Sequence, residues 1–182
     1  MKKIKNKNSS NQLRLLLVSY YDFSESWGFM SKIKGSLIKL WTNGNFYHTE
    51  LILGNNRITS HTSTGVEVKE VKEDKMNSII DRISQNAEIL DLSYYFDTSN
   101  PDKIKEIEEF LDSQKGKLYD WKAIFLTQFV NLNREDKERW FCSEIVAEIL
   151  KILDNSDKDK ILKFKSAYYN PSNLEGAFLS LS

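Results

Sequence analysis

The sequence predicts an α+β fold in which an antiparallel sheet packs against helices. Short segments with the alternating pattern of β-strands, separated by turn residues, cluster between residues 46 and 92. Segments with helical spacing of apolar residues surround this cluster on both sides. A strand, a helix, a run of strands and then several helices form the order that is typical of the α+β class.

Five segments have the pattern of strands. The first is an apolar run, the next two flank a Gly-Asn-Asn turn and so predict a hairpin, and the fourth alternates strictly. In chain order, the expected strands lie at residues 13–20, 46–53, 57–62, 66–71 and 87–92.

Helices are expected from apolar residues that recur every three or four positions. Pro101 after Asn100 is a typical helix start, and Gly116 is a typical stop. The expected helices lie at residues 27–40, within 74–85 as a short connecting helix, at 101–115, from about 119–121 to 129, and from 142 to 153. The segment at 161–181 reads as a mixed tail with a turn at 170–172.

Length and composition restrict the classes of protein. The chain has 182 residues, which suits one domain; we expect a disordered or loosely held segment at 1–12 and a single domain at 13–182. The 26 basic and 26 acidic residues cancel, which argues against nucleic acid as a partner. No segment approaches the roughly 20 apolar residues of a membrane span. With no signal peptide recognised, a cytoplasmic location is the expectation.

Cys142 is the only cysteine, so the chain forms no internal disulfide. It lies where a polar segment passes into a helix whose apolar residues include Ile145, Val146 and Ile149. The positive end of a helix favours a thiolate over a thiol. Cys142 is therefore a candidate nucleophile, although a lone cysteine before an apolar helix face is also common as a small core residue.

His48 is the candidate base for that thiol. Strand periodicity puts His48, Glu50 and Ile52 on one face of the expected hairpin strand, and Thr49 and Leu51 on the opposite face. An imidazole beside a nucleophilic thiol takes its proton, and a third polar group fixes the orientation of the ring. A His and a Glu two residues apart are also ordinary on a half-exposed strand.

The third polar group depends on the register of the hairpin. If residues 54–56 form the loop, Glu50 faces Ser60; if Asn55 and Asn56 form a two-residue turn, Glu50 faces His61. We expect Glu50 as the third residue, with Ser60 and His61 as the alternatives. No metal site and no cofactor are expected, because a thiol with a free imidazole explains these residues better than a metal does.

These residues resemble a known family. Residues 46–51, a Gly-Asn turn and residues 60–66 are similar to the first motif of the circularly permuted branch of the NlpC-type papain-like superfamily, the YiiX-like group. Residues 116–121, followed by 140–144, are similar to its second motif. The likeness covers about residues 41–146, with an echo at 170–174. Bacterial and bacteriophage proteins of this branch carry the motifs in the same order.

The resemblance implies a permuted papain-like fold with Cys142 as nucleophile, His48 as general base and an often acidic third residue. Relatives with a glutamate on the second hairpin strand differ from this chain, which has Ser60 and His61 there. It also implies hydrolysis of peptide or amide bonds, including those of cell-wall peptides, or thioester chemistry on acyl substrates. A bacteriophage virion with its partner proteins is a second possible location.

The leading hypothesis is a cysteine hydrolase of the amidase or peptidase type. Tyr119 and Trp140 are candidate substrate-binding residues, although aromatic residues near helix starts more often belong to the core. A second hypothesis is a catalytically inactive binding or structural protein, such as a virion component. A third is a lipid acyltransferase or phospholipase, for which the segment at 27–41 would be the membrane-docking helix.

Overall fold

The computed structural model describes residues 12–19, 45–61, 64–84, 87–119, 139–140, 142–154, 162 and 169–179. For residues 61, 118, 119, 139 and 140 only the backbone is described. The expected helices at 27–40 and 121–129, and the expected disorder at 1–11, lie outside these ranges.

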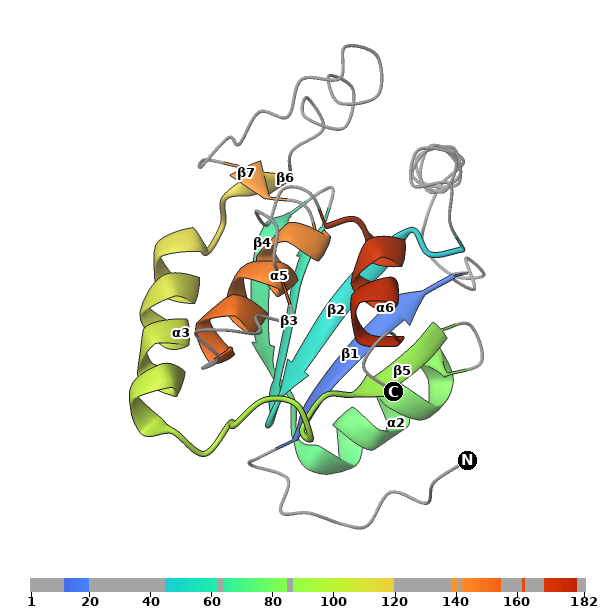
Figure 1. Cartoon of the computed structure of the whole chain (residues 1–182), viewed down its shortest axis with the longest axis horizontal. Helices are drawn as coiled ribbons and strands as arrows, with labels where there is room; N and C mark the ends of the chain where they lie inside the picture. The colour runs from blue at the N-terminus through green and yellow to red at the C-terminus, as the bar shows by residue number, and fades with distance from the viewer. Residues whose placement is uncertain are drawn as a thin grey trace.

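An antiparallel sheet forms the centre of the molecule, with the strands in the order β4-β3-β2-β1-β5 (Figure 1). This arrangement confirms the general α+β class. The strands are β1 (Leu13–Val18), β2 (His48–Leu53), β3 (Asn56–His61), β4 (Gly65–Glu70) and β5 (Ala87–Asp91). All five lie within one or two residues of their expected positions.

The β2–β3 turn differs from both registers expected from the sequence. Leu53 pairs with Asn56, so the turn consists of Gly54 and Asn55 alone. Gly54 has a φ of 57°, a conformation that glycine adopts at little cost and that two-residue hairpin turns require. Because Asn56 belongs to the strand, every later residue of β3 faces the side opposite to the one expected for a turn at 54–56.

Helices cover both faces of the sheet. The described helices are α2 (Glu73–Ile83), α3 (Pro101–Gln114), α5 (Cys142–Leu153) and α6 (Pro171–Leu179). Apolar residues of α3, α5 and α6 share one core with Leu15, Leu51 and Ile58 of the sheet. Met76 and Ile83 of α2 pack in a second core with Leu16, Val18 and Ile52.

Two helix starts are set by asparagine side chains. Asn100 Oδ1 accepts hydrogen bonds from the backbone N–H groups of Asp102 and Lys103, which confirms the expected start of α3. Asn170 Oδ1 accepts a hydrogen bond from the N–H of Asn173 at 2.8 Å. The expectation of only a turn at 170–172 was therefore wrong, because this cap and Pro171 begin the helix α6.

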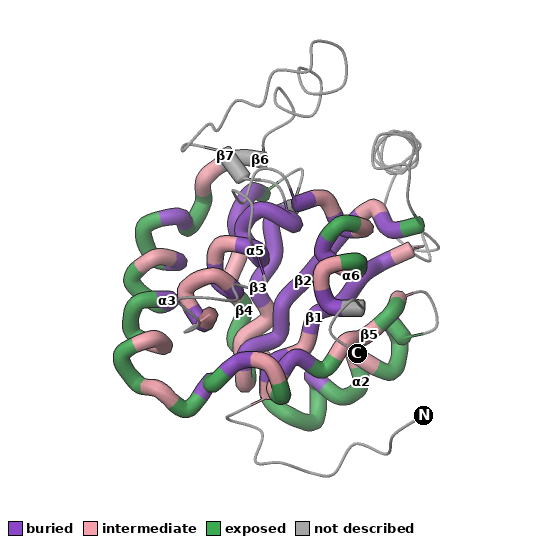
Figure 2. The backbone as a smooth tube through the Cα atoms, viewed as in Figure 1, coloured by how far each residue is buried: buried purple, intermediate pink, exposed green. Residues whose placement is uncertain are grey.

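β1, β2 and α5 form the buried centre of the molecule (Figure 2). All six residues of β2 are buried, including His48 and Glu50. The sequence allowed for a half-exposed strand here, but a core lies on each side of β2. Helix α5 packs directly on β2 and β3, so its first residue lies near the start of β2.

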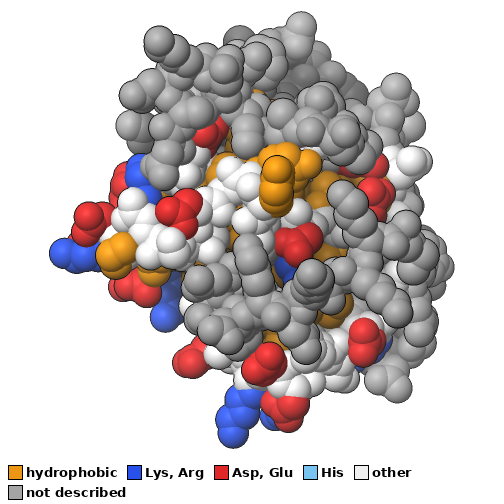
Figure 3. Space-filling view, turned by 60° about the horizontal axis from the view of Figure 1, so that its bottom comes forward, with side chains coloured by type: hydrophobic (Ala, Val, Ile, Leu, Met, Phe, Trp, Pro, Cys, Tyr) orange, Lys and Arg blue, Asp and Glu red, His pale blue; other side chains and the backbone are white. Residues whose placement is uncertain are grey.

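The coloured residues on one face of the molecule carry acidic and basic side chains side by side (Figure 3). Ion pairs along α3, such as Lys103 with Glu106 and Lys105 with Glu109, have the same mixed character. Among the helices in the described ranges, none has the length and apolar character needed to cross a membrane.

The segment before Cys142 is held beside the edge of the sheet. Gly116 and Lys117 exchange backbone hydrogen bonds with Val66 of β4. The next residues form β6 (Leu118–Tyr119), which pairs in parallel with β7 (Arg139–Trp140). A helix beginning at Tyr119 was expected, but Tyr119 lies in a strand. This short ladder fixes the chain two residues before Cys142.

Candidate functional site

Cys142 is the first residue of α5 and is only 2% exposed. Its place at a helix start confirms the sequence prediction. Behind it, Ile145, Val146 and Ile149 are fully buried against the sheet. The helix is thus held by its apolar side, and this packing fixes the position of the sulfur.

The backbone ladder between β2 and β3 ends before the part of β2 that Cys142 contacts. β2 pairs with β1 along its whole length, from His48 to Leu53, but with β3 only from Leu51 to Leu53. In the unpaired part, the backbone of Thr49 makes a hydrogen bond with Cys142. The start of α5 therefore contacts β2 where β3 has separated from it.

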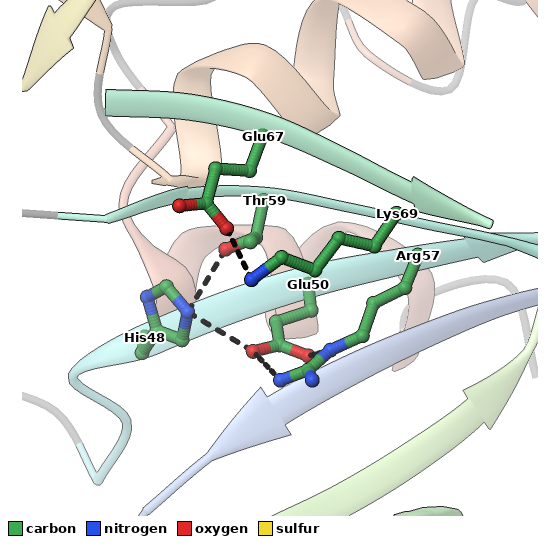
Figure 4. Close-up of polar contacts among 6 residues, drawn as sticks. All are labelled: His48, Glu50, Arg57, Thr59, Glu67 and Lys69. Atoms are coloured by element: carbon green, nitrogen blue, oxygen red, sulfur yellow. Dashed lines mark hydrogen bonds and ion pairs between the residues drawn. The ribbon is translucent and has the colours of Figure 1, made fainter. Parts of the chain in front are cut away.

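His48 lies at the beginning of β2, and its Nε2 atom has two polar neighbours. Thr59 Oγ1 lies 3.0 Å from Nε2, and Glu50 Oε1 lies 3.3 Å from it (Figure 4). His48 also forms a hydrogen bond with Cys142. Because Nε2 is already used, we infer that Nδ1 is the nitrogen that faces the sulfur.

His48 and Cys142 have pKa values that favour an ion pair. Burial acts to lower the pKa of His48, but the charge of Cys142 and hydrogen bonds with Cys142 and Glu50 raise it from 6.5 to about 9. Burial acts to raise the pKa of the Cys142 thiol, but the charge and hydrogen bond of His48, with help from Thr49, bring it below its ordinary value. Both shifts therefore favour transfer of the Cys142 proton to His48.

Glu50 is fully buried and is held by Arg57. Arg57 Nε donates to Glu50 Oε2 at 2.5 Å, and Arg57 Nη2 donates to Oε1 at 2.6 Å. Burial acts to raise the pKa of Glu50, but hydrogen bonds from His48 and Arg57, together with their charges, lower it well below its ordinary range. The carboxylate is therefore ionised and lies between two cations.

Thr49 is the other polar residue that contacts the sulfur. Its side chain is completely buried, and Oγ1 has no well-aligned hydrogen-bond partner. The hydroxyl still lowers the pKa of Cys142, though by less than the Thr49 backbone does.

The structure brings Cys142, His48 and Glu50 together, as the sequence predicted. The observed register puts Thr59 on the face of Glu50 and the alternative third residue Ser60 on the opposite face. Ser60 is fully buried there. For His61, only its backbone place at the end of β3 is described.

The candidate substrate-binding residues lie next to one another in the chain fold. Tyr119 of β6 is the register partner of Trp140 of β7. Their side chains lie outside the described part of the structure, as do residues 27–41, so the substrate-binding role of these two aromatic residues and the membrane-docking helix stay predictions.

Thr59 and Arg57 are site residues that the sequence analysis missed. Both share the Glu50 face of the sheet, and Figure 4 shows their side chains pointing toward His48 and Glu50. The signal was present in Gly54: a turn at Gly54 and Asn55 places Thr59 opposite Glu50 and Arg57 one step further along the same face.

No group of three or more potential metal ligands occurs among the residues that the structure describes. Comparison of the chain with protein-family models, curated proteins and solved structures found no significant match. Function is therefore argued from the site itself. A thiol of lowered pKa, an imidazole hydrogen-bonded to it and a buried carboxylate beside that imidazole are the groups that nucleophilic attack on a carbonyl carbon requires.

Proposed function

We propose that this protein is a cysteine hydrolase of the amidase or peptidase type, with Cys142 as nucleophile and His48 as acid and base. The observation that carries the proposal is the coupling of Cys142 with His48 by charge and hydrogen bond, inside a buried site. Glu50 at the far ring nitrogen supports it, because a carboxylate there orients the ring and stabilises the imidazolium.

In this proposal the Cys142 thiolate attacks the carbonyl carbon of an amide. The carbonyl oxygen becomes an oxyanion, and backbone N–H groups at the start of α5 are suitable donors to it. His48 gives its proton to the leaving nitrogen, the C–N bond breaks, and a thioester remains on Cys142. His48 then takes a proton from water, which attacks the thioester and releases a carboxylic acid and the free thiolate.

The resemblance to the permuted papain-like branch favours peptides, including cell-wall peptides, as the substrate class. A permuted papain-like fold and a cytoplasmic or virion location belong to the same proposal. The observed antiparallel sheet, with α5 packed on β2 and β3, is compatible with that fold.

Alkylation of the native protein by iodoacetamide tests the proposal, since the only thiol in the chain belongs to Cys142. We expect rapid labelling at pH 6, where an ordinary thiol with a pKa of about 8.5 is almost entirely protonated. His48→Ala should slow labelling at this pH at least tenfold, and Cys142→Ser should abolish it. Slow labelling that does not depend on His48 would rule out an activated nucleophile.

A binding or structural protein is the second candidate, because Cys142 is 2% exposed and His48 is 7% exposed. A closed site of this kind can hold an ion pair without turning over a substrate. The two candidates differ in their reaction with bulky electrophiles. A peptidyl chloromethyl ketone that labels Cys142 supports a substrate cleft, whereas labelling by iodoacetamide alone supports the closed site.

A further inference from the structure

Arg57 is linked to the candidate nucleophile through a chain of three contacts. Its guanidinium makes two hydrogen bonds to Glu50, at 2.5 and 2.6 Å. Glu50 Oε1 lies 3.3 Å from His48 Nε2, and His48 is hydrogen-bonded to Cys142. The two-bond geometry fixes both the position and the plane of the carboxylate, which a single bond does not do.

The charges along this chain alternate in sign. In the ion-pair form of the site, Cys142 and Glu50 are negative, His48 and Arg57 are positive, and the sum over the four groups is zero. Glu50 is 0% exposed. Without Arg57, the other three groups would leave one uncompensated negative charge in this buried site. Unpaired buried charge is strongly unfavourable, so the site would respond by binding a proton.

Among the described residues, the other charged groups near this site are less well placed than Arg57 to compensate the negative charge of Glu50. Lys69 of β4 is the register partner of Arg57, but its side chain is 61% exposed and its ammonium pairs with Glu67 at 2.6 Å. On β1, the register partner of Glu50 is the apolar Leu16, and Arg14 on the same face is the register partner of the acidic Asp91 of β5. On α5, the acidic Glu144 follows Cys142 in the first turn and adds negative charge, not positive.

We propose that Arg57 is a positioning residue of this site: it holds Glu50 ionised and in plane, and Glu50 in turn holds the His48 ring against Cys142. This inference rests on the proposed function. It adds a fourth member to the Cys142–His48–Glu50 set, and that member touches neither the thiol nor a substrate.

The test is the pH profile of Cys142 alkylation by iodoacetamide in the full-length protein. In Arg57→Met, we expect the acid midpoint of the profile to move up by about one pH unit, since removal of a neighbouring opposite charge shifts a carboxylate or thiolate by about 1–3 units. The same substitution made in a Glu50→Gln background should give no further shift, because Arg57 acts through Glu50.

Lys69→Met is the matched control. It removes a cation from the neighbouring position on the same face of the sheet and should leave the acid midpoint unchanged. Arg57→Lys loses the planar two-bond contact but keeps the charge. Because the charge is kept, the acid midpoint of Arg57→Lys should lie close to the wild-type value.

Three results would overturn the inference. The first is a folded Arg57→Met protein with the native midpoint, and the second is an equal shift in the Glu50→Gln background. If Arg57→Met does not fold, the Glu50→Gln/Arg57→Met double variant should fold, because neither buried charge remains. The third result that would overturn the inference is that neither of these two variants folds. Failure of the proposed function looks different, namely a wild-type midpoint near that of an ordinary thiol.

Discussion

The His48 ring and the Thr59 hydroxyl lie 3.0 Å apart, across the part of β2 and β3 where the two strands are not paired. Glu50 lies 3.3 Å from the same ring nitrogen. With the pKa of His48 raised to about 9, Nε2 carries a hydrogen at neutral pH and has two acceptors. The predictions below follow from this arrangement and from the backbone around it.

Glu50 should orient the ring more strongly than Thr59 does. A hydrogen bond to a charged acceptor is roughly twice as strong as one to a neutral acceptor, even though the hydroxyl is nearer here. We expect Thr59→Val to slow iodoacetamide alkylation of Cys142 at pH 6 less than Glu50→Gln does. Thr59→Ser, which keeps the hydroxyl, is the control. A larger effect from Thr59→Val would make Thr59 the third member of the set.

The Thr49 hydroxyl should stabilise the thiolate. Thr49→Val removes the hydroxyl at nearly constant volume, and the lost interaction should raise the pKa of Cys142. Absorbance of the thiolate at 240 nm, followed as a function of pH, measures this change. We expect a shift smaller than the one caused by His48→Ala, because the charge of His48 lowers the pKa of Cys142 most and the Thr49 side chain lowers it least. An unchanged titration would show that the Thr49 backbone alone acts on the sulfur.

His48 should lose much of its high pKa when the thiolate is removed. The charge of Cys142 is the largest of the effects that raise the pKa of His48, so Cys142→Ser should bring the value down from about 9. The chain has two histidines, and NMR titration of their ring protons can follow both. Because the pKa is raised on folding, this group stabilises the fold fully below pH 6.5, and the contribution is lost as the pH rises through about 9.

Glu50 should make the protein sensitive to acid. Its pKa is lowered on folding, so its contribution to stability is present above the ordinary value of 4.5 and is lost as the pH falls toward the folded value. The melting temperature of the wild type should therefore fall more steeply below pH 4.5 than that of Glu50→Gln. Thermal unfolding followed by circular dichroism measures both curves, and parallel curves would contradict the assignment of a buried, charged Glu50.

Gly116 and Gly176 allow the effect of a positive φ on stability to be measured by two matched Gly→Ala substitutions. A Cβ atom added at either residue meets no atom within 4 Å, but only Gly116 has a positive φ, of 78°. Gly116→Ala should cost about 1–2 kcal/mol of unfolding free energy, whereas Gly176→Ala inside α6 should add about 0.5–1 kcal/mol. Urea unfolding gives both values. Equal effects would mean that φ is not what distinguishes the two sites.

Strands β1 to β5, helices α3 and α5, and the positions of Cys142 and His48 in them could be predicted from the sequence because each depends on local pattern, whereas α6 was expected only as a turn and Tyr119 in a helix. The apolar spacing behind Cys142 marks α5, and the alternation around His48 marks β2. The partners of Glu50 could not be predicted in this way. The partners of Glu50 depend on whether β3 begins at Asn56 or at Arg57, and amino-acid composition does not decide between the two. The positive φ of Gly54 in the structure sets the turn at Gly54 and Asn55, so β3 begins at Asn56.

The two-residue turn at Gly54 and Asn55 therefore decides which chemistry surrounds the imidazole. Lengthening that loop by a single amino acid would shift β3 by one residue against β2, which would send the guanidinium and the threonine hydroxyl to the opposite face of the sheet and bring their neighbours to this one. The length of the turn at Gly54 and Asn55 is therefore under constraint during evolution. An insertion there would replace the side chains that surround His48, even though the turn lies away from the candidate reacting atoms.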